Sequence, residues 1–156
     1  MNSILIQEHY TVENCLNNPR HLYIFGDNLI KQGKGGQAII RDCPNAFGIP
    51  IKRYSNNKET SFFSDKPDEI YAVETAINHL NRLTKTTKKY NTIVFPMYGL
   101  GIGLVKMPTH SSIIYKLMIN NLMKQIIIPK WVLCGALNLR IISSYPNYGQ
   151  DGYLYG

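Results

Sequence analysis

Two glycine-rich turns contain the residues of this chain that are best suited to hold a ligand. The first covers residues 25–38 and includes FGDN and GKGGQA, and the second covers residues 95–104 and reads FPMYGLGIGL. Each follows a short apolar run typical of a β-strand and leads toward a helical pattern, so both are expected at carboxyl ends of strands, where α/β sheets bind ligands. Glycine lets backbone N–H groups approach a ligand, and a helix N-terminus favours phosphate. We therefore expect the two turns to bind a nucleotide diphosphate.

An alternation of strand and helix patterns must position these turns. Asp65 is a suitable N-cap for the longest helical pattern, which has Pro67 in its first turn and apolar residues at helical spacing. The predicted helices are 36–42, 65–83 and one capped by Thr109 or Ser111 that stops before Pro129. The predicted strands are 22–25, 47–51, 92–95 and 131–135. The order β-α-β-α-β-α-β predicts an α/β sandwich.

Length and composition indicate one domain. A chain of 156 residues with 44% hydrophobic residues has enough apolar material for a single sizeable core. We expect one domain over residues 1–156, with an irregular segment rich in Tyr and Gly at 145–156. The net charge of +7 favours anionic partners. The densest basic run, residues 85–89, is read as a solvated surface loop.

The spacing of the cysteines and the hydropathy of the chain indicate the cellular compartment of the protein. Cys15, Cys43 and Cys134 lie far apart and lack the spacing of zinc ligands, which predicts a reducing compartment and no bound metal. No apolar run approaches the roughly 20 residues that a membrane span requires, and no signal segment is readable at the N-terminus. We therefore expect a cytoplasmic protein without a membrane partner or a cofactor.

Five motifs together resemble small phage and bacterial proteins of the macro-domain-like class. They occur in order at 26–28, 33–38, 45–52, 61–65 and 95–104, and the resemblance covers about residues 20 to 125. It implies a three-layer α/β/α sandwich with a mixed sheet and a cleft over the strand ends. Macro domains bind ADP-ribose or its derivatives, and some hydrolyse ADP-ribose from proteins or nucleic acids. For a phage protein, the compartment would be the host cytoplasm.

The resemblance also implies roles for individual residues. Asp27 corresponds to the acid that accepts a hydrogen bond from the adenine amino group, Asn28 and residues 33–36 approach the distal ribose and the diphosphate, and the second turn closes over the phosphates. Lys52 can meet a phosphate, and Phe62, Phe63 or Tyr98 can stack on a base or ribose. The expected ligand-binding residues are Gly26, Asp27, Asn28, Gly33, Lys34, Gly35, Gly36, Gln37, Phe62, Phe63, Tyr98, Gly99, Leu100, Gly101, Ile102 and Gly103.

Catalysis is assigned to Asp27, Asn28 and Lys52. Macro-like enzymes that pair a lysine with an acid place that acid in the second glycine turn, whereas residues 98–106 of this chain contain neither Asp nor Glu. Slow ADP-ribosyl hydrolysis would then use a water molecule that is activated by a phosphate of the substrate or by Asp27. Two alternatives stay open: a phage protein that sequesters an ADP-ribose-type defence signal without turnover, and a basic module that binds nucleic acid.

Overall fold

A four-stranded parallel sheet forms the centre of the molecule. In the computed structural model, which describes residues 3–135, the sheet contains β1 (Ser3–Gln7), β2 (His21–Asn28), β3 (Ala46–Lys52) and β4 (Thr92–Pro96), in the order β1-β4-β2-β3. Every pairing between these strands is parallel, so the mixed sheet implied by the family resemblance is wrong for the described residues. Each connection between consecutive strands crosses over the sheet, which returns every strand in the same direction.

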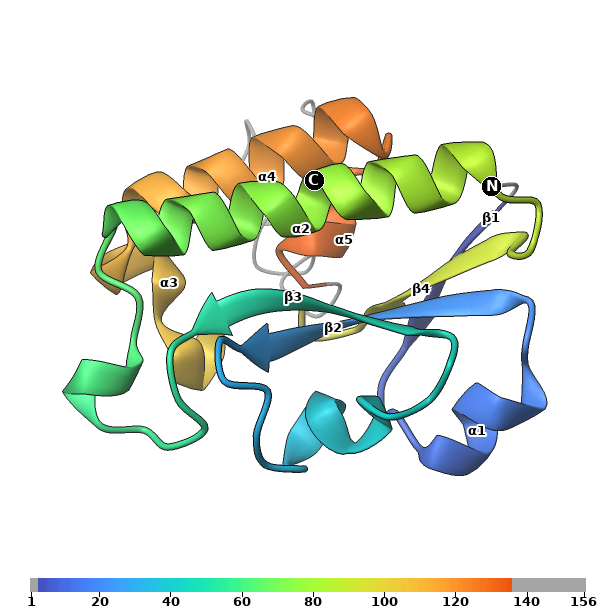
Figure 1. Cartoon of the computed structure of the whole chain (residues 1–156), viewed down its shortest axis with the longest axis horizontal. Helices are drawn as coiled ribbons and strands as arrows, with labels where there is room; N and C mark the ends of the chain where they lie inside the picture. Colours follow the sequence, from blue (N-terminus) through green and yellow to red (C-terminus); the bar gives the residue numbers. More distant parts are fainter. Residues whose placement is uncertain (1–2, 136–156) are drawn as a thin grey trace, which may run out of the picture.

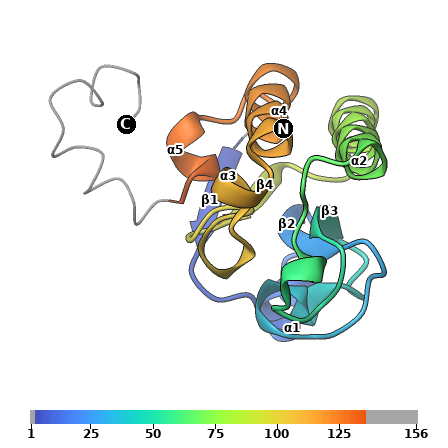
Figure 2. The same ribbon diagram turned by 90° about the vertical axis from the view of Figure 1, so that its left-hand side faces the viewer.

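Helices lie on both faces of this sheet, which confirms the predicted α/β class (Figure 1). One face carries the long helices α2 (Pro67–Thr86) and α4 (Ser112–Gln125), together with the short α3 (Met107–His110) and α5 (Lys130–Leu133). Among the described residues, the other face carries α1 (Val12–Asn17) and the 3-10 helix η1 (Gly36–Ile40). Two further 3-10 turns, η2 (Glu59–Ser61) and η3 (Gly103–Val105), lie in loops. The view along the sheet shows the thick helical layer on one side and α1 on the other (Figure 2).

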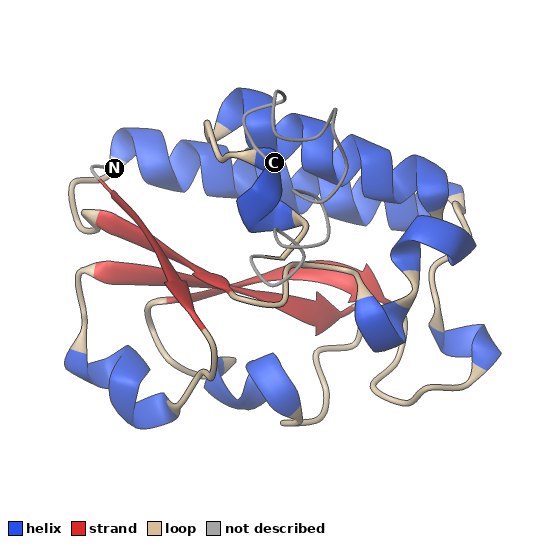
Figure 3. Ribbon diagram, turned by 180° about the vertical axis from the view of Figure 1, so that it is seen from behind, coloured by secondary structure: helices blue, strands red, loops and turns tan. Residues whose placement is uncertain are grey.

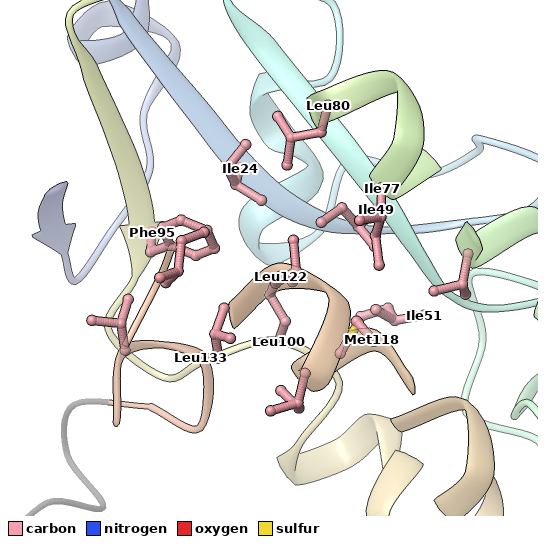
Figure 4. Packing of buried hydrophobic residues seen from close by; sticks show 14 of the residues in the cluster. Ile24, Ile49, Ile51, Ile77, Leu80, Phe95, Leu100, Met118, Leu122 and Leu133 are labelled. Carbon is pink, nitrogen blue, oxygen red and sulfur yellow. The ribbon is translucent and has the colours of Figure 1, made fainter. Parts of the chain in front are cut away.

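Strand side chains alternate between two apolar clusters. On β2, Leu22 and Ile24 belong to the larger cluster, which packs against the long helices, whereas Tyr23 and Phe25 belong to the smaller cluster. This is the two-residue period of a strand, and burial on both faces explains why these strands are continuous apolar runs. Figure 4 shows part of the larger cluster, and the sheet between its two helical layers is visible from behind in Figure 3. The labelled members in Figure 4 are Ile24, Ile49, Ile51, Ile77, Leu80, Phe95, Leu100, Met118, Leu122 and Leu133.

Two strand predictions differ from the structure. Residues 3–7 form the edge strand β1, which the sequence patterns did not predict. Residues 131–135 were predicted as a strand, but the chain forms the helical turn α5, whose N-cap is Pro129. A short apolar run fits a buried helical turn as well as a strand, so its periodicity could not separate the two. The predicted helix at 36–42 is the 3-10 helix η1.

The start of α2 also differs from its prediction. Its N-cap is Lys66, and Oε1 of Glu69 accepts a hydrogen bond from the backbone N–H of Lys66 at 2.9 Å. Asp65 has a left-handed backbone with φ 61° and serves a different helix. Its carboxylate accepts hydrogen bonds from the N–H groups of Ile113 and Ile114, at 3.3 and 2.9 Å, in the first turn of α4. Ser111 occupies the predicted N-cap position of α4, but its side chain makes no capping hydrogen bond, because its hydroxyl donates to the carbonyl of Met107.

Candidate functional site

Both glycine turns lie at the carboxyl edge of the sheet, on neighbouring strands. β2 leads into the first turn and then to η1 on one face, whereas β4 leads into the second turn and then to α3 and α4 on the opposite face (Figures 1 and 2). Connections that leave adjacent strand ends toward opposite faces open a crevice between them, and this is the usual place for a ligand in an α/β sheet.

The crevice is a cleft of about 870 Å3. Cavities of this size hold small ligands and cofactors. Residues from the connections after all four strands line it, so the cleft crosses the whole carboxyl edge of the sheet. Twelve residues predicted from the sequence are among them: Gly26, Asp27, Asn28, Gly33, Gly35, Gly36, Gln37, Lys52, Tyr98, Gly99, Gly101 and Ile102.

Other predicted site residues lie outside the cleft lining. Phe62 and Phe63 are buried, with Phe62 next to β3 through a bridge to Lys52, so their rings serve the core and do not form a stacking platform. Leu100 is also in the core. Lys34 forms an exposed ion pair with Asp42. Gly103 begins η3.

Asp27 is held by an arginine that the sequence analysis did not single out. The Nη2 of Arg41 lies 2.7 Å from Oδ1 of Asp27, and its Nε lies 3.1 Å from both carboxylate oxygens. The same guanidinium donates to the carbonyls of Gln32 and Gly33. Hydrogen bonding to Asp27 raises the pKa of Arg41, so this group stays charged. Arg41 therefore ties the first glycine turn to the end of β2.

Polar side chains shape the rest of the first turn. The amide of Asn28 donates to the carbonyl of Gln32 at 2.8 Å, and its oxygen accepts from the N–H of Gln32 at 3.2 Å. Oε1 of Gln37 accepts from the N–H of Gly26 at 2.9 Å, which joins η1 to β2. Asn28 and Gln37 thus fix the path of the backbone, although both also line the cleft.

The glycine turn presents unbonded backbone donors. Within residues 3–135, the N–H groups of Gly33, Gly35 and Gly36 form no hydrogen bond. Gly33 and Gly36 have φ values of 82° and 57°, and a turn that includes such residues can point successive N–H groups at one anion. A Cβ built on Gly35 or Gly36 meets no atom within 4 Å, so neither position is filled by the protein itself.

Glycines of the second turn have a different role. A Cβ on Gly101 would lie 2.3 Å from Sδ of Met107, and a Cβ on Gly99 would lie 2.7 Å from the backbone of Leu133 and Gly135. Both glycines also have positive φ, of 76° and 82°. Packing against α3 and α5 therefore requires glycine at these two positions whether or not a ligand is bound.

Lys52 is the cleft lysine with no carboxylate partner in the described part of the chain. Its Nζ lies 3.4 Å from the carbonyl oxygen of Asn56 and 3.5 Å from Oδ1 of Asn57. Burial lowers the pKa of Lys52 from its ordinary value. An anion in the cleft would offset the free-energy cost of burying the charged amine and would give Lys52 an oppositely charged partner.

The connection after β1 adds residues that the sequence analysis missed. Glu8, His9 and Tyr10 line the cleft, and the hydroxyl of Tyr98 donates to Oε1 of Glu8 at 3.3 Å. The hydroxyl of Tyr10 is buried and donates to the carbonyl of Ile24 at 2.7 Å, which fixes this connection beneath the cleft. The apolar run of Ile4, Leu5 and Ile6 is the signal that could have placed Glu8 at a strand end.

Metal and membrane functions gain no support from the described residues. Residues 3–135 contain no group of three or more His, Cys, Asp or Glu side chains placed to hold a metal ion. The helices in this part of the chain are all too short or too polar to cross a bilayer.

Comparison with known protein families identifies the family of this chain. Residues 5–121 match the Family of unknown function (DUF7831). The chain belongs to this family. The matched region of this DUF7831 protein contains both glycine turns, Arg41 and Lys52, as well as Glu8. No curated protein and no solved structure matched the chain.

Proposed function

We propose that the cleft binds a nucleotide of the ADP-ribose type. The observation that carries this proposal is the meeting of the two glycine turns in one cleft, where Gly33, Gly35 and Gly36 offer unbonded backbone donors. The diphosphate takes these N–H groups as partners, as phosphates do at other glycine-rich turns. Lys52 supplies a positive charge at the same edge of the sheet.

Binding rather than fast turnover is the activity that we propose. Hydrolysis needs a base that positions water, and Asp27 is engaged by Arg41 and by the N–H of Asn28 at 2.8 Å. Both oxygens of this carboxylate already have protein partners, which compete with a water molecule for them. Sequestration of an ADP-ribose-type signal therefore fits this cleft better than rapid ADP-ribosyl hydrolysis.

Isothermal titration calorimetry with ADP-ribose tests the proposal. We expect a single site, and a thermal-unfolding scan at 100 times Kd should show about 2.7 kcal/mol of added stability. A single-stranded oligonucleotide at low and high salt is the comparison. If the oligonucleotide binds with steep salt dependence and ADP-ribose does not bind, the chain is a nucleic-acid-binding module and the proposal is wrong. Release of free ADP-ribose from an ADP-ribosylated protein would show a hydrolase instead of a binder.

A further inference from the structure

The cleft has opposite charges at its two ends. Glu8 directly follows β1, and Lys52 is the last residue of β3. The order β1-β4-β2-β3 places these strands at opposite edges of the sheet. Three strand spacings separate them, or about 14 Å. The glycine turns, which follow β4 and β2, lie between the two charged groups.

Within residues 3–135, Glu8 forms no ion pair with a lysine or an arginine, and Tyr98 positions its carboxylate. The N–H of Met97 donates to the carbonyl of Gln7 at 3.0 Å, which brings the connections after β1 and β4 together. This contact places Tyr98 where its hydroxyl reaches Glu8, whose side chain is 47% exposed. The nearest cationic group in the described chain is the imidazole of His9, with Nε2 3.8 Å from Oε2, and it is charged only when protonated.

A carboxylate at this end selects for a particular chemical group. Ionised Glu8 can only accept hydrogen bonds, and it repels phosphate, so the part of the ligand beside it must carry neutral donors. Ribose hydroxyls are such donors.

We propose that Glu8 accepts hydrogen bonds from the vicinal hydroxyls of the terminal ribose of the bound nucleotide, and that Tyr98 positions its carboxylate. This inference rests on the proposed function. It orients the ligand along the sheet edge, with the terminal ribose at the β1 end and the diphosphate over the glycine turns, on the side toward Lys52. Glu8 thereby becomes the residue that distinguishes ADP-ribose from ADP, which lacks the second ribose.

Calorimetric titration of the full chain with ADP-ribose and with ADP tests this assignment. We expect Glu8→Ala to weaken ADP-ribose about tenfold, in line with the loss of a hydrogen bond to a charged group. Glu8→Gln should weaken it less, because the amide oxygen still accepts, and neither variant should change the affinity for ADP by more than about twofold. Glu13→Gln, an exposed residue of α1 outside the cleft lining, is the matched charge control and should change neither affinity.

Tyr98→Phe tests the positioning role. It should reduce the preference for ADP-ribose over ADP while leaving ADP binding unchanged, whereas a merely structural role of the hydroxyl would weaken both ligands. Equal effects of Glu8→Ala on the two ligands, or no effect on either, would overturn the assignment of Glu8 and leave nucleotide binding intact. A wild-type chain that binds neither ligand would instead overturn the proposed function.

Discussion

Arg41 and Asp27 form a bidentate ion pair beneath the first glycine turn, with Nη2 2.7 Å from Oδ1 and Nε 3.1 Å from Oδ2. Both side chains are largely buried, at 11% and 6% exposure. The guanidinium also reaches the carbonyls of Gln32 and Gly33, so one side chain joins the end of β2 to the loop that carries the free N–H groups. Asp27 thus organises the first glycine turn through Arg41.

Arg41→Ala is therefore expected to destabilise the fold. Loss of the guanidinium leaves the carboxylate of Asp27 buried without its counter-charge, and removal of one partner of a buried pair costs about 3 kcal/mol or more. Lys34→Ala is the matched control, because its ion pair with Asp42 is exposed and should contribute less than about 1 kcal/mol. Urea unfolding measures both values. Equal losses for the two variants would contradict the importance of the Arg41–Asp27 pair.

The sequence predicted local features of this site well because each had a local signal. A glycine turn after an apolar strand predicts that Gly26 and Gly35 lie at the carboxyl edge of the sheet. In the structure both glycines line the cleft at this edge. Arg41 gave no such signal, because its partner Asp27 lies 14 residues away and the contact depends on how η1 folds back. Side-chain periodicity reports which face is buried, not which ion pairs form.

Tertiary context also decided the elements that were predicted incorrectly. Asp65 carries the signal of an N-cap, and its carboxylate is a cap, but for α4 instead of the helix that follows it in sequence. The three apolar residues of β1 carry a weak strand signal, and pairing with β4 makes the segment a strand. The order of strands, which places Glu8 and Lys52 at opposite ends of the cleft, has no local signal at all.

The cap formed by Asp65 leads to a stability prediction. Asp65→Ala should cost about 1 kcal/mol or somewhat more, because it leaves the N–H groups of Ile113 and Ile114 without their acceptor and places alanine at a positive φ. Asp65→Asn should cost less, since the amide oxygen still accepts a hydrogen bond and asparagine tolerates this backbone. Denaturant unfolding of both variants provides the measurement. A loss for Asp65→Asn as large as that for Asp65→Ala would show that charge, not capping, is the relevant property.

Gly35 and Gly101 are expected to respond in opposite ways to an added methyl group. Gly35→Ala should leave the free energy of unfolding within about 0.5 kcal/mol of the wild type, because its φ is −77° and no atom lies within 4 Å of the added Cβ. It should nevertheless weaken ADP-ribose, because the methyl group separates the turn from the phosphates. Gly101→Ala should lose more than about 1 kcal/mol of stability through its positive φ and its clash with Met107. Unfolding and titration of the same preparations separate the two effects, and unchanged affinity in Gly35→Ala would remove the first turn from the site.

Lys52 gives the binding reaction a pH dependence whose direction can be worked out. Burial lowers the pKa of Lys52 in the free protein, and only the protonated amine pairs with phosphate. Affinity for ADP-ribose should therefore be greatest below the lowered pKa, fall as the pH rises through it, and level off above the higher pKa of the complex. Arginine stays protonated throughout this range, so Lys52→Arg should remove the decrease, whereas Lys52→Met should weaken binding about tenfold at neutral pH. Calorimetry across the alkaline range tests both variants, and an alkaline decrease that persists in Lys52→Met would assign the titration to another group.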